Sequence, residues 1–361
     1  MDRRNFIKFG GAGAALMAVS PKGFSNANES VFWRNFRITY YVELPGDQGQ
    51  AKLWLPMPWG EDNAYQRSVP AIWNGSPDKA ALQKLGGGQT AFVAEWQGKA
   101  PRTVTVSTVI KTADRHANLA LASKDAKAAL PKDVKEWLKP SARIATDGSI
   151  RSTAKTVTKG AASPLEQARA IYDWVVENVR YDANIRGCGQ GDPKTMLDSG
   201  NLAGRSADYS ALFVALCRAS GIPAREQYGI RVDGSDLFKS LGLYGDVSRG
   251  HHGRAEFYVA GAGWVPVDPS DVRRAAELEN LSLSDPKIAK LKDTLFGTWE
   301  MNWIALNFGD ETKLPGSANG SLPFFTFPQA ELAGKKRDSL DPTTFAYRIE
   351  SRELIGTGVK F

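Results

Sequence analysis

The segment from Ser206 to Ser220 constrains the fold more than any other part of this sequence. Its apolar side chains have the spacing of a helix that is buried, and they include Leu212, Phe213, Leu216 and Cys217. Gly221 supplies a helix stop, and Pro223 follows directly after it. The segment therefore predicts a helix over 206–220 that lies inside a core.

Two strand patterns follow this helix. Residues 224–232 form the first, and residues 255–259 turn through a Gly-rich stretch into residues 264–268. The second pattern is a hairpin whose last strand ends on Asp268. The start of one strand and the end of the next lie at the same edge of an antiparallel hairpin. We therefore expect His252 and Asp268 to be neighbours.

A helix start is predicted at Ser163, ahead of this core. Ser163 can cap the helix, Pro164 suits its first position, and Glu166 completes a capping box. Apolar residues then recur on one face as far as Val179. A loop rich in Gly and Asp, residues 184–204, separates this helix from the next.

The remaining residues divide by composition. The stretch Phe36–Leu44 is rich in β-branched and aromatic residues, and Pro45-Gly46 ends it. We predict a β-rich domain, a linker with short helices, a core and a C-terminal extension that packs on the core. Their ranges are 28–115, 116–162, 163–275 and 276–361.

The first 27 residues resemble a signal peptide of the twin-arginine pathway. Arg3-Arg4 is followed by a polar residue, two apolar residues and a lysine, and then by a mildly apolar stretch. That stretch is too short to span a membrane. Removing residues 1–27 lowers the net charge from +7 to +4. We expect a periplasmic protein with no membrane span, and its mild charge gives no case for nucleic-acid binding.

Three residues have the types and order needed for acyl transfer. Ser206 opens a helix after a Gly-rich loop, where the helix terminus supplies free N–H groups and partial positive charge. His252 can take and return a proton. Asp268 can hold the histidine in one orientation. We identify these three residues as a candidate catalytic triad.

Three motifs in this region resemble the transglutaminase-like superfamily, whose fold is related to papain. They are Gly204–Phe213 with Gly221-Ile222-Pro223-Ala224-Arg225, the Ala255-Glu256 pair three residues after His252, and Gly263–Pro269. The resemblance implies an α+β fold with a papain-like core. It also implies attack on peptide or glutamine amides of a peptide or protein substrate, with hydrolysis or transfer through an acyl-enzyme. No cofactor is implied.

Ser206 occupies the position where this superfamily carries a cysteine. A thiol is readily ionised beside a histidine, whereas a hydroxyl must lose its proton during attack. Three interpretations follow: a serine nucleophile, a degenerate site that only binds, or an engineered replacement. The alternative function is therefore an inactive periplasmic protein that binds peptides or cell-wall components. The substrate and the oligomeric state are not indicated by the sequence.

Cys188 and Cys217 are the two cysteines of the chain. Cys217 lies in the apolar helix, where a buried and inert thiol is expected. Cys188 lies in the Gly-flanked loop and is a rival candidate for the nucleophile. Gln190 is a candidate oxyanion donor, with the backbone N–H of Ser206 as the alternative. The cysteines and histidines lack the spacing of a metal site.

Overall fold

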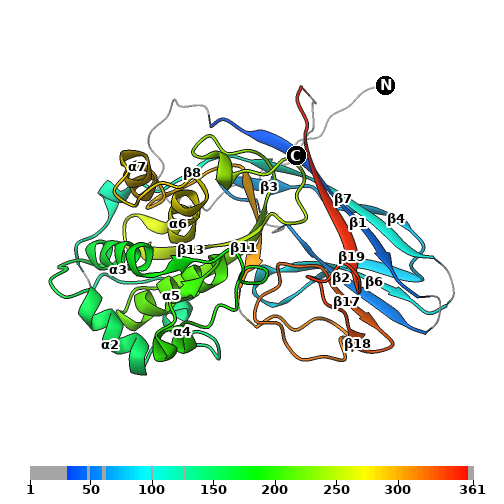
Figure 1. The fold of residues 1–361 in the computed structure, drawn as a ribbon, viewed down its shortest axis with the longest axis horizontal. Coiled ribbons are helices and arrows are strands. Elements are labelled where there is room, and N and C mark those ends of the chain that lie inside the picture. The colour runs from blue at the N-terminus through cyan, green and yellow to red at the C-terminus, as the bar shows by residue number, and fades with distance from the viewer. Residues whose placement is uncertain are drawn as a thin grey trace, which may run out of the picture. The chain divides into compact units, whose positions relative to one another are not determined.

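The computed structural model describes residues 31–46, 49–58, 62–98, 101–125, 127–309 and 311–356. The predicted signal peptide, residues 1–27, lies outside the described residues. Strands dominate the first and last parts of the described chain, and most helices lie between them (Figure 1). No helix in this part of the chain is both long and apolar enough to cross a membrane.

Two antiparallel sheets contain the N-terminal strands. The first has β7 (Arg102–Thr112) at a branch point, where it pairs with β1, β3 and β4. Its other strands are β12 (Gly245–Asp246), β19 (Ala346–Glu353), β1 (Arg34–Leu44), β3 (Gln66–Ser68) and β4 (Ile72–Gly75). The second sheet runs in the order β18 (Lys335–Lys336), β17 (Gln329–Leu332), β2 (Ala51–Met57), β6 (Thr90–Trp96), β5 (Lys79–Lys84).

These two sheets share one apolar core. Alternate residues of β1, including Phe36, Ile38 and Tyr40, are fully buried. They belong to one cluster with Leu53 and Leu55 of β2 and with apolar residues of β6. This alternation is what a strand with one buried face requires. The β-rich region before the core is therefore present as predicted.

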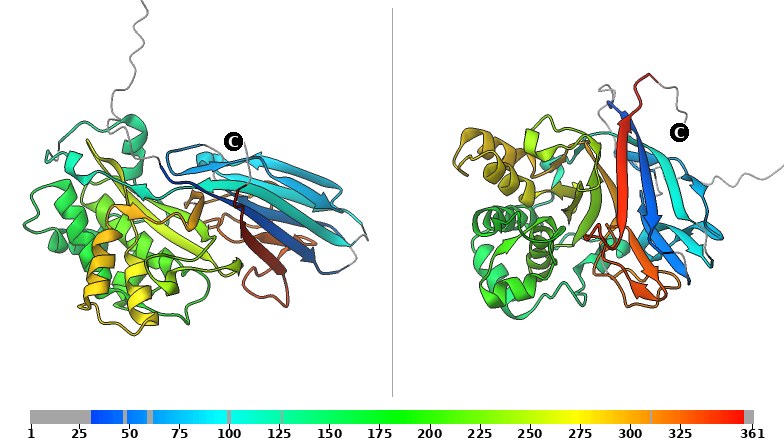
Figure 2. Two further views of the ribbon diagram at one scale, coloured as in Figure 1. Left: turned by 90° about the horizontal axis from the view of Figure 1, so that it is seen from above. Right: turned by 45° about the vertical axis from the view of Figure 1, so that its right-hand side comes forward.

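Strands from the end of the chain complete both sheets. β19 pairs antiparallel with β1, so that Ile349 lies opposite Tyr40, and β17 pairs with β2. Figures 1 and 2 show β19, in red, beside β1, in blue. The predicted extension 276–361 thus contributes strands to the N-terminal sheets as well as to the core. The boundaries drawn from the sequence stay predictions.

A third antiparallel sheet forms the core around the candidate site. Its order is β14 (Gly263–Val267), β13 (His251–Val259), β11 (Ala224–Arg231), β16 (Trp303–Phe308). Two small ladders join β9 (Arg180–Tyr181) to β10 (Ala203–Gly204) and β8 (Arg115–His116) to β15 (Thr298–Trp299). The α-helices are α1 (Lys132–Lys135), α2 (Gly148–Val157), α3 (Pro164–Asn178), α4 (Pro193–Ser199), α5 (Ser206–Ala219), α6 (Pro269–Leu278) and α7 (Pro286–Thr294). The 3₁₀ turns are η1 (Gly86–Gly88), η2 (Leu119–Leu121), η3 (Glu136–Leu138) and η4 (Lys239–Leu241).

Helix α5 is the centre of this core. Each of its residues from Ser206 to Arg218 is buried. Phe213 meets Phe257 of β13 with ring centroids 6.0 Å apart. Helices α2, α3 and α6 supply further apolar side chains to the same cluster. A helix that is apolar on most of its surface is stable only when enclosed in this way, and the α+β fold predicted from the sequence is confirmed.

The helix ends follow the sequence signals. The hydroxyl of Ser163 accepts the N–H of Glu166 at 3.2 Å, and the Glu166 carboxylate accepts the N–H of Ala162 at 2.7 Å. The return bond thus reaches one residue before the cap. Helix α5 ends at Ala219, and Gly221 has a φ of +80°. Glycine adopts this left-handed conformation without a steric penalty.

Candidate active site

The N-terminus of α5 is fixed by the carboxylate of Asp208. This carboxylate accepts backbone N–H bonds from Arg205 at 2.8 Å, Gln190 at 3.0 Å and Gly191 at 2.8 Å. It therefore ties the Gly-rich loop to the first turn of the helix. Burial raises the pKa of Asp208, and the three N–H donors oppose that rise.

Ser206 lies between this loop and the start of β13. Its Oγ accepts the backbone N–H of Gly253 at 3.0 Å. The carbonyl of Cys188 accepts the N–H of Ala207 at 2.8 Å. Cys188, which the sequence left in a loop away from any helix start, is thus attached to the first turn of α5.

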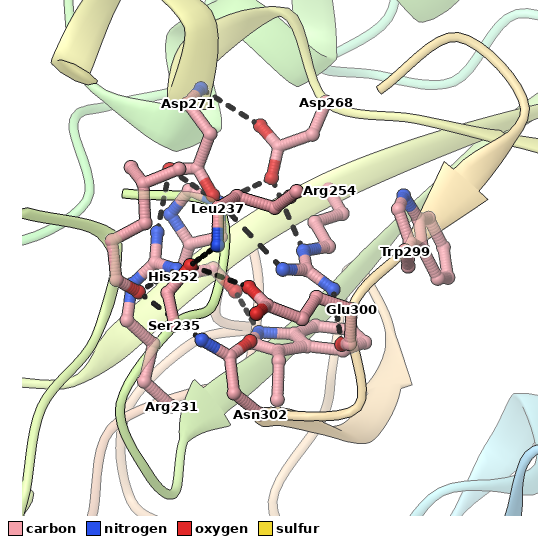
Figure 3. A network of polar contacts seen from close by, with 12 residues as sticks. Arg231, Ser235, Leu237, His252, Arg254, Asp268, Asp271, Trp299, Glu300 and Asn302 are labelled. Atoms are coloured by element: carbon pink, nitrogen blue, oxygen red, sulfur yellow. Dashed lines mark hydrogen bonds and ion pairs between the residues drawn. The ribbon is translucent and has the colours of Figure 1, made fainter. Parts of the chain in front are cut away.

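His252 and Asp268 are direct neighbours, as the hairpin predicted. The Nε2 atom of His252 lies 2.8 Å from Oδ2 of Asp268 (Figure 3). The other oxygen of Asp268 accepts the hydroxyl of Ser270 and the N–H of Asp271, each at 3.0 Å. Asp268 therefore caps α6 and orients His252 at once. Burial lowers the pKa of His252, with Asp271 acting in the opposite direction.

A second acidic residue and two arginines surround this pair. Asp271 Oδ1 lies 3.5 Å from His252 Nε2 and 2.5 Å from Arg231 Nη2. Arg254 Nε lies 3.1 Å from Asp268 Oδ2. Figure 3 shows the five side chains converging at the ends of β11, β13 and β14. Asp271, Arg231 and Arg254 were not predicted from the sequence. The spacing of Asp271 three residues after Asp268, within the first turn of a helix, was the available signal.

These charges neutralise one another. Burial alone would raise the pKa of Asp271, but Arg231, His252 and Arg254 together hold it well below its usual range. His252, Asp268 and Asp271 could in principle offer three ligand atoms to a metal ion, since these atoms lie within 4.8 Å of one another. Each carboxylate already has an arginine partner, so the cluster is satisfied as an ion-pair network.

The three predicted residues meet at one place, although through an intermediary. Ser206 bonds to Gly253, which directly follows His252, and His252 bonds to Asp268. In the described part of the chain, no hydrogen bond joins the Ser206 hydroxyl to the His252 ring itself. Catalytic hydrogen bonds are often long before substrate binds. The ring of His251 packs against Phe327, with ring centroids 4.5 Å apart.

A C-terminal segment, residues 322–327, covers this region and is named the strap here. The ring of Phe324 stacks on Tyr228 with centroids 4.3 Å apart, and the Thr326 hydroxyl donates to the carbonyl of Gly229 at 3.3 Å. Ser206 is 6% exposed and His252 is 4% exposed. The site is therefore enclosed by the chain's own residues.

The two thiols are both free and buried. Burial raises the pKa of Cys188 to about 11, and the Ser206 side chain opposes the rise. Burial also raises the pKa of Cys217, as expected for an inert thiol inside α5. Gln190 is the candidate oxyanion donor, and its backbone N–H donates to the carboxylate of Asp208.

Comparison with known proteins identifies the family. The sequence profile of the Transglutaminase-like superfamily matches residues 151–269. An uncharacterized protein of Haemophilus influenzae is 35% identical over 357 residues, which cover 94% of this chain and 96% of that protein. The chain belongs to the transglutaminase-like superfamily.

A solved structure shares the fold at low sequence identity. A candidate cysteine protease from Cytophaga hutchinsonii has a TM-score of 0.56 and 16% identity, over 92% of this chain and 96% of that chain. The periplasmic domain of TgpA from Pseudomonas aeruginosa has a TM-score of 0.37 and 13% identity, over 69% of this chain and 93% of that chain.

The clamp made by Asp208 predicts a large cost for a side chain at Gly189. Gly189 has a φ of +93°, and a Cβ there would collide with the Asp208 carboxylate. Gly221 has a φ of +80° but open space around its Cβ position. Gly221→Ala should therefore lower the free energy of unfolding by about 1 kcal/mol, the cost of the left-handed conformation for alanine. Gly189→Ala should lower it by about 2 kcal/mol more because of overpacking. Urea unfolding measures both, and equal losses would contradict the clamp.

Burial of His251 predicts a pH-dependent stability. Burial lowers the pKa of His251 to about 3, whereas the unfolded side chain titrates near its ordinary value of 6.5. Below pH 6.5 the unfolded state binds the proton and the folded state does not, so stability falls as pH falls. Between pH 7.5 and 5.5, His251 should account for about 1 kcal/mol of lost unfolding free energy.

Chemical denaturation at the two pH values tests this account. His251→Gln should reduce the loss by that amount. His116→Gln, at an exposed position, should leave the loss unchanged. A wild-type free energy that stays constant over this range would show that His251 is not buried in its neutral form.

Proposed function

We propose that this protein transfers acyl groups from peptide or glutamine amide bonds, with Ser206 as nucleophile, His252 as base and Asp268 as the orienting acid. One observation carries the proposal. The buried contact of 2.8 Å between His252 and Asp268 lies beside a serine hydroxyl at a helix N-terminus. Membership of the transglutaminase-like superfamily supports the same reaction class.

The chemistry follows from the roles of the three groups. Asp268 holds Nε2 of His252, which leaves Nδ1 as the nitrogen that accepts the proton of Ser206 during attack on the amide carbonyl. The backbone N–H of Ser206 can stabilise the developing oxyanion, whereas the N–H of Ala207 is already bound to the carbonyl of Cys188. His252 then gives the proton to the leaving amine as the C–N bond breaks. Water or an amine resolves the ester on Ser206.

The hydroxyl limits the rate of this reaction. A thiol with an ordinary pKa near 8.5 can be ionised in advance by a neighbouring histidine, whereas a serine must lose its proton in the transition state. We therefore propose slow turnover by the wild type. The alternative from the sequence, a protein that binds peptides or cell-wall components without turnover, predicts no acyl-enzyme at all.

Replacement of Ser206 by cysteine tests the triad directly. We expect Ser206→Cys to gain a thiol that iodoacetamide alkylates at least about tenfold faster than Cys188 or Cys217, because a histidine-paired thiol is more ionised at neutral pH. Peptide mass spectrometry locates the alkylated cysteine. Adding His252→Ala should remove the gain, and adding His116→Ala should not. A residue 206 thiol that is unreactive, or reactive without His252, would refute the assignment.

We also propose export to the periplasm by the twin-arginine pathway, on the sequence of residues 1–27. Replacing Arg3 and Arg4 together by lysine keeps the charge but removes the arginine pair. We expect the variant to accumulate uncleaved in the cytoplasmic fraction, while a variant with Lys22→Arg is still exported and shortened. Periplasmic recovery of the double-lysine variant would contradict this pathway.

A further inference from the structure

Two hollows border the Gly-rich loop near Ser206. The first has a volume of about 430 Å³ and lies between residues 186–189 and parts of the segment 322–340. The second, of about 640 Å³, lies between residues 189–192 and 321–324, with Arg143 and Glu311 on its wall. The two hollows share Gly189 and Leu322–Phe324 of the strap, so they are neighbours beside the loop.

Cys188 connects the first hollow to the candidate nucleophile. Cys188 lines that hollow, and its carbonyl accepts the N–H of Ala207, the residue after Ser206, at 2.8 Å. A group held in the first hollow against Cys188 is therefore next to a residue that is bonded to the first turn of α5. Phe324 of the strap lines both hollows.

The two hollows carry opposite charge. Three cations line the first hollow, namely Arg186, Lys336 and Arg337, against the one carboxylate of Asp338. That carboxylate is paired with Arg186 at 2.6 Å. Among the described residues, Lys336 and Arg337 make no salt bridge.

The second hollow instead presents two carboxylates, those of Asp192 and Glu311. Its one cation, Arg143, is committed to Glu226 by a salt bridge. The positive charge is thus concentrated in the hollow that Cys188 lines.

We propose that the first hollow is a specificity subsite for a carboxylate-bearing side chain of the peptide whose amide reacts at Ser206. Phe324, Phe327 and Leu340 receive the aliphatic part of that side chain, and Lys336 with Arg337 attracts its carboxylate. The proposal rests on the proposed function for the identity of the reacting amide. The anion preference of the hollow itself does not depend on turnover.

Alkylation of Cys188 by an anionic and a neutral reagent of similar size tests the subsite. Iodoacetate and iodoacetamide form the same S–C bond and release iodide, but only iodoacetate is anionic. We expect the ratio of the iodoacetate rate to the iodoacetamide rate at Cys188 to fall about fivefold in the Lys336→Gln/Arg337→Gln variant at low salt. The iodoacetamide rate should not change. Lys239→Gln/Lys290→Gln, which alters cations at a different hollow, should leave the ratio unchanged.

The outcomes separate this proposal from the proposed function. Peptide mapping distinguishes Cys188 from Cys217, and Cys188→Ser should remove the signal. A ratio equal in wild type and the Lys336/Arg337 variant would overturn the subsite. So would a native Cys188 that neither reagent reaches. A fall in the ratio supports the subsite even if Ser206→Cys proves unreactive, because alkylation of Cys188 requires neither Ser206 nor His252.

Discussion

The site depends on the contacts that the buried carboxylate of Asp268 makes with His252, Arg254 and the first turn of α6. This carboxylate stands where β14 ends and α6 begins, and it accepts bonds from the first turn of that helix. The same group contacts His252 of β13 and Arg254 two residues further along. One buried charge therefore fixes a hairpin edge, a helix start and an imidazole together. Removing it would leave Arg254 buried with only the longer contact of 4.0 Å to Asp271, and breaking a buried ion pair is strongly destabilising.

A network of this kind explains why the site can be both buried and polar. Two aspartates, two arginines and a histidine occupy a region with almost no solvent exposure. A buried charge is tolerated only when it is paired and hydrogen-bonded. Here Asp271 neutralises Arg231 and Asp268 neutralises Arg254. The histidine is thus left neutral by burial, which is the state in which it can accept a proton.

The sequence revealed those parts of the site that depend on local patterns. The cap at Ser163, the buried helix from Ser206 and the hairpin ending at Asp268 follow from periodicity and turn chemistry, and these needed no knowledge of distant contacts. Arg231, Arg254 and Asp271 were missed because each is an ordinary polar residue in its own segment. They become a network only when β11, β13 and α6 meet. The strap was missed for the same reason, because its contacts with Tyr228 and Gly229 join distant parts of the sequence. Thr326 and Gly229, for example, are 97 residues apart.

We propose above all that Ser206 is a nucleophile and that His252 is its general base. A fluorophosphonate reports on this proposal most directly, because the serine oxygen must displace fluoride from phosphorus while the histidine takes the proton. We predict that the intact mass of the wild-type protein rises by one adduct, that peptide mapping places it on Ser206, and that His252→Ala does not form it. A wild-type protein that stays unmodified, or carries the adduct on another residue, would contradict the account.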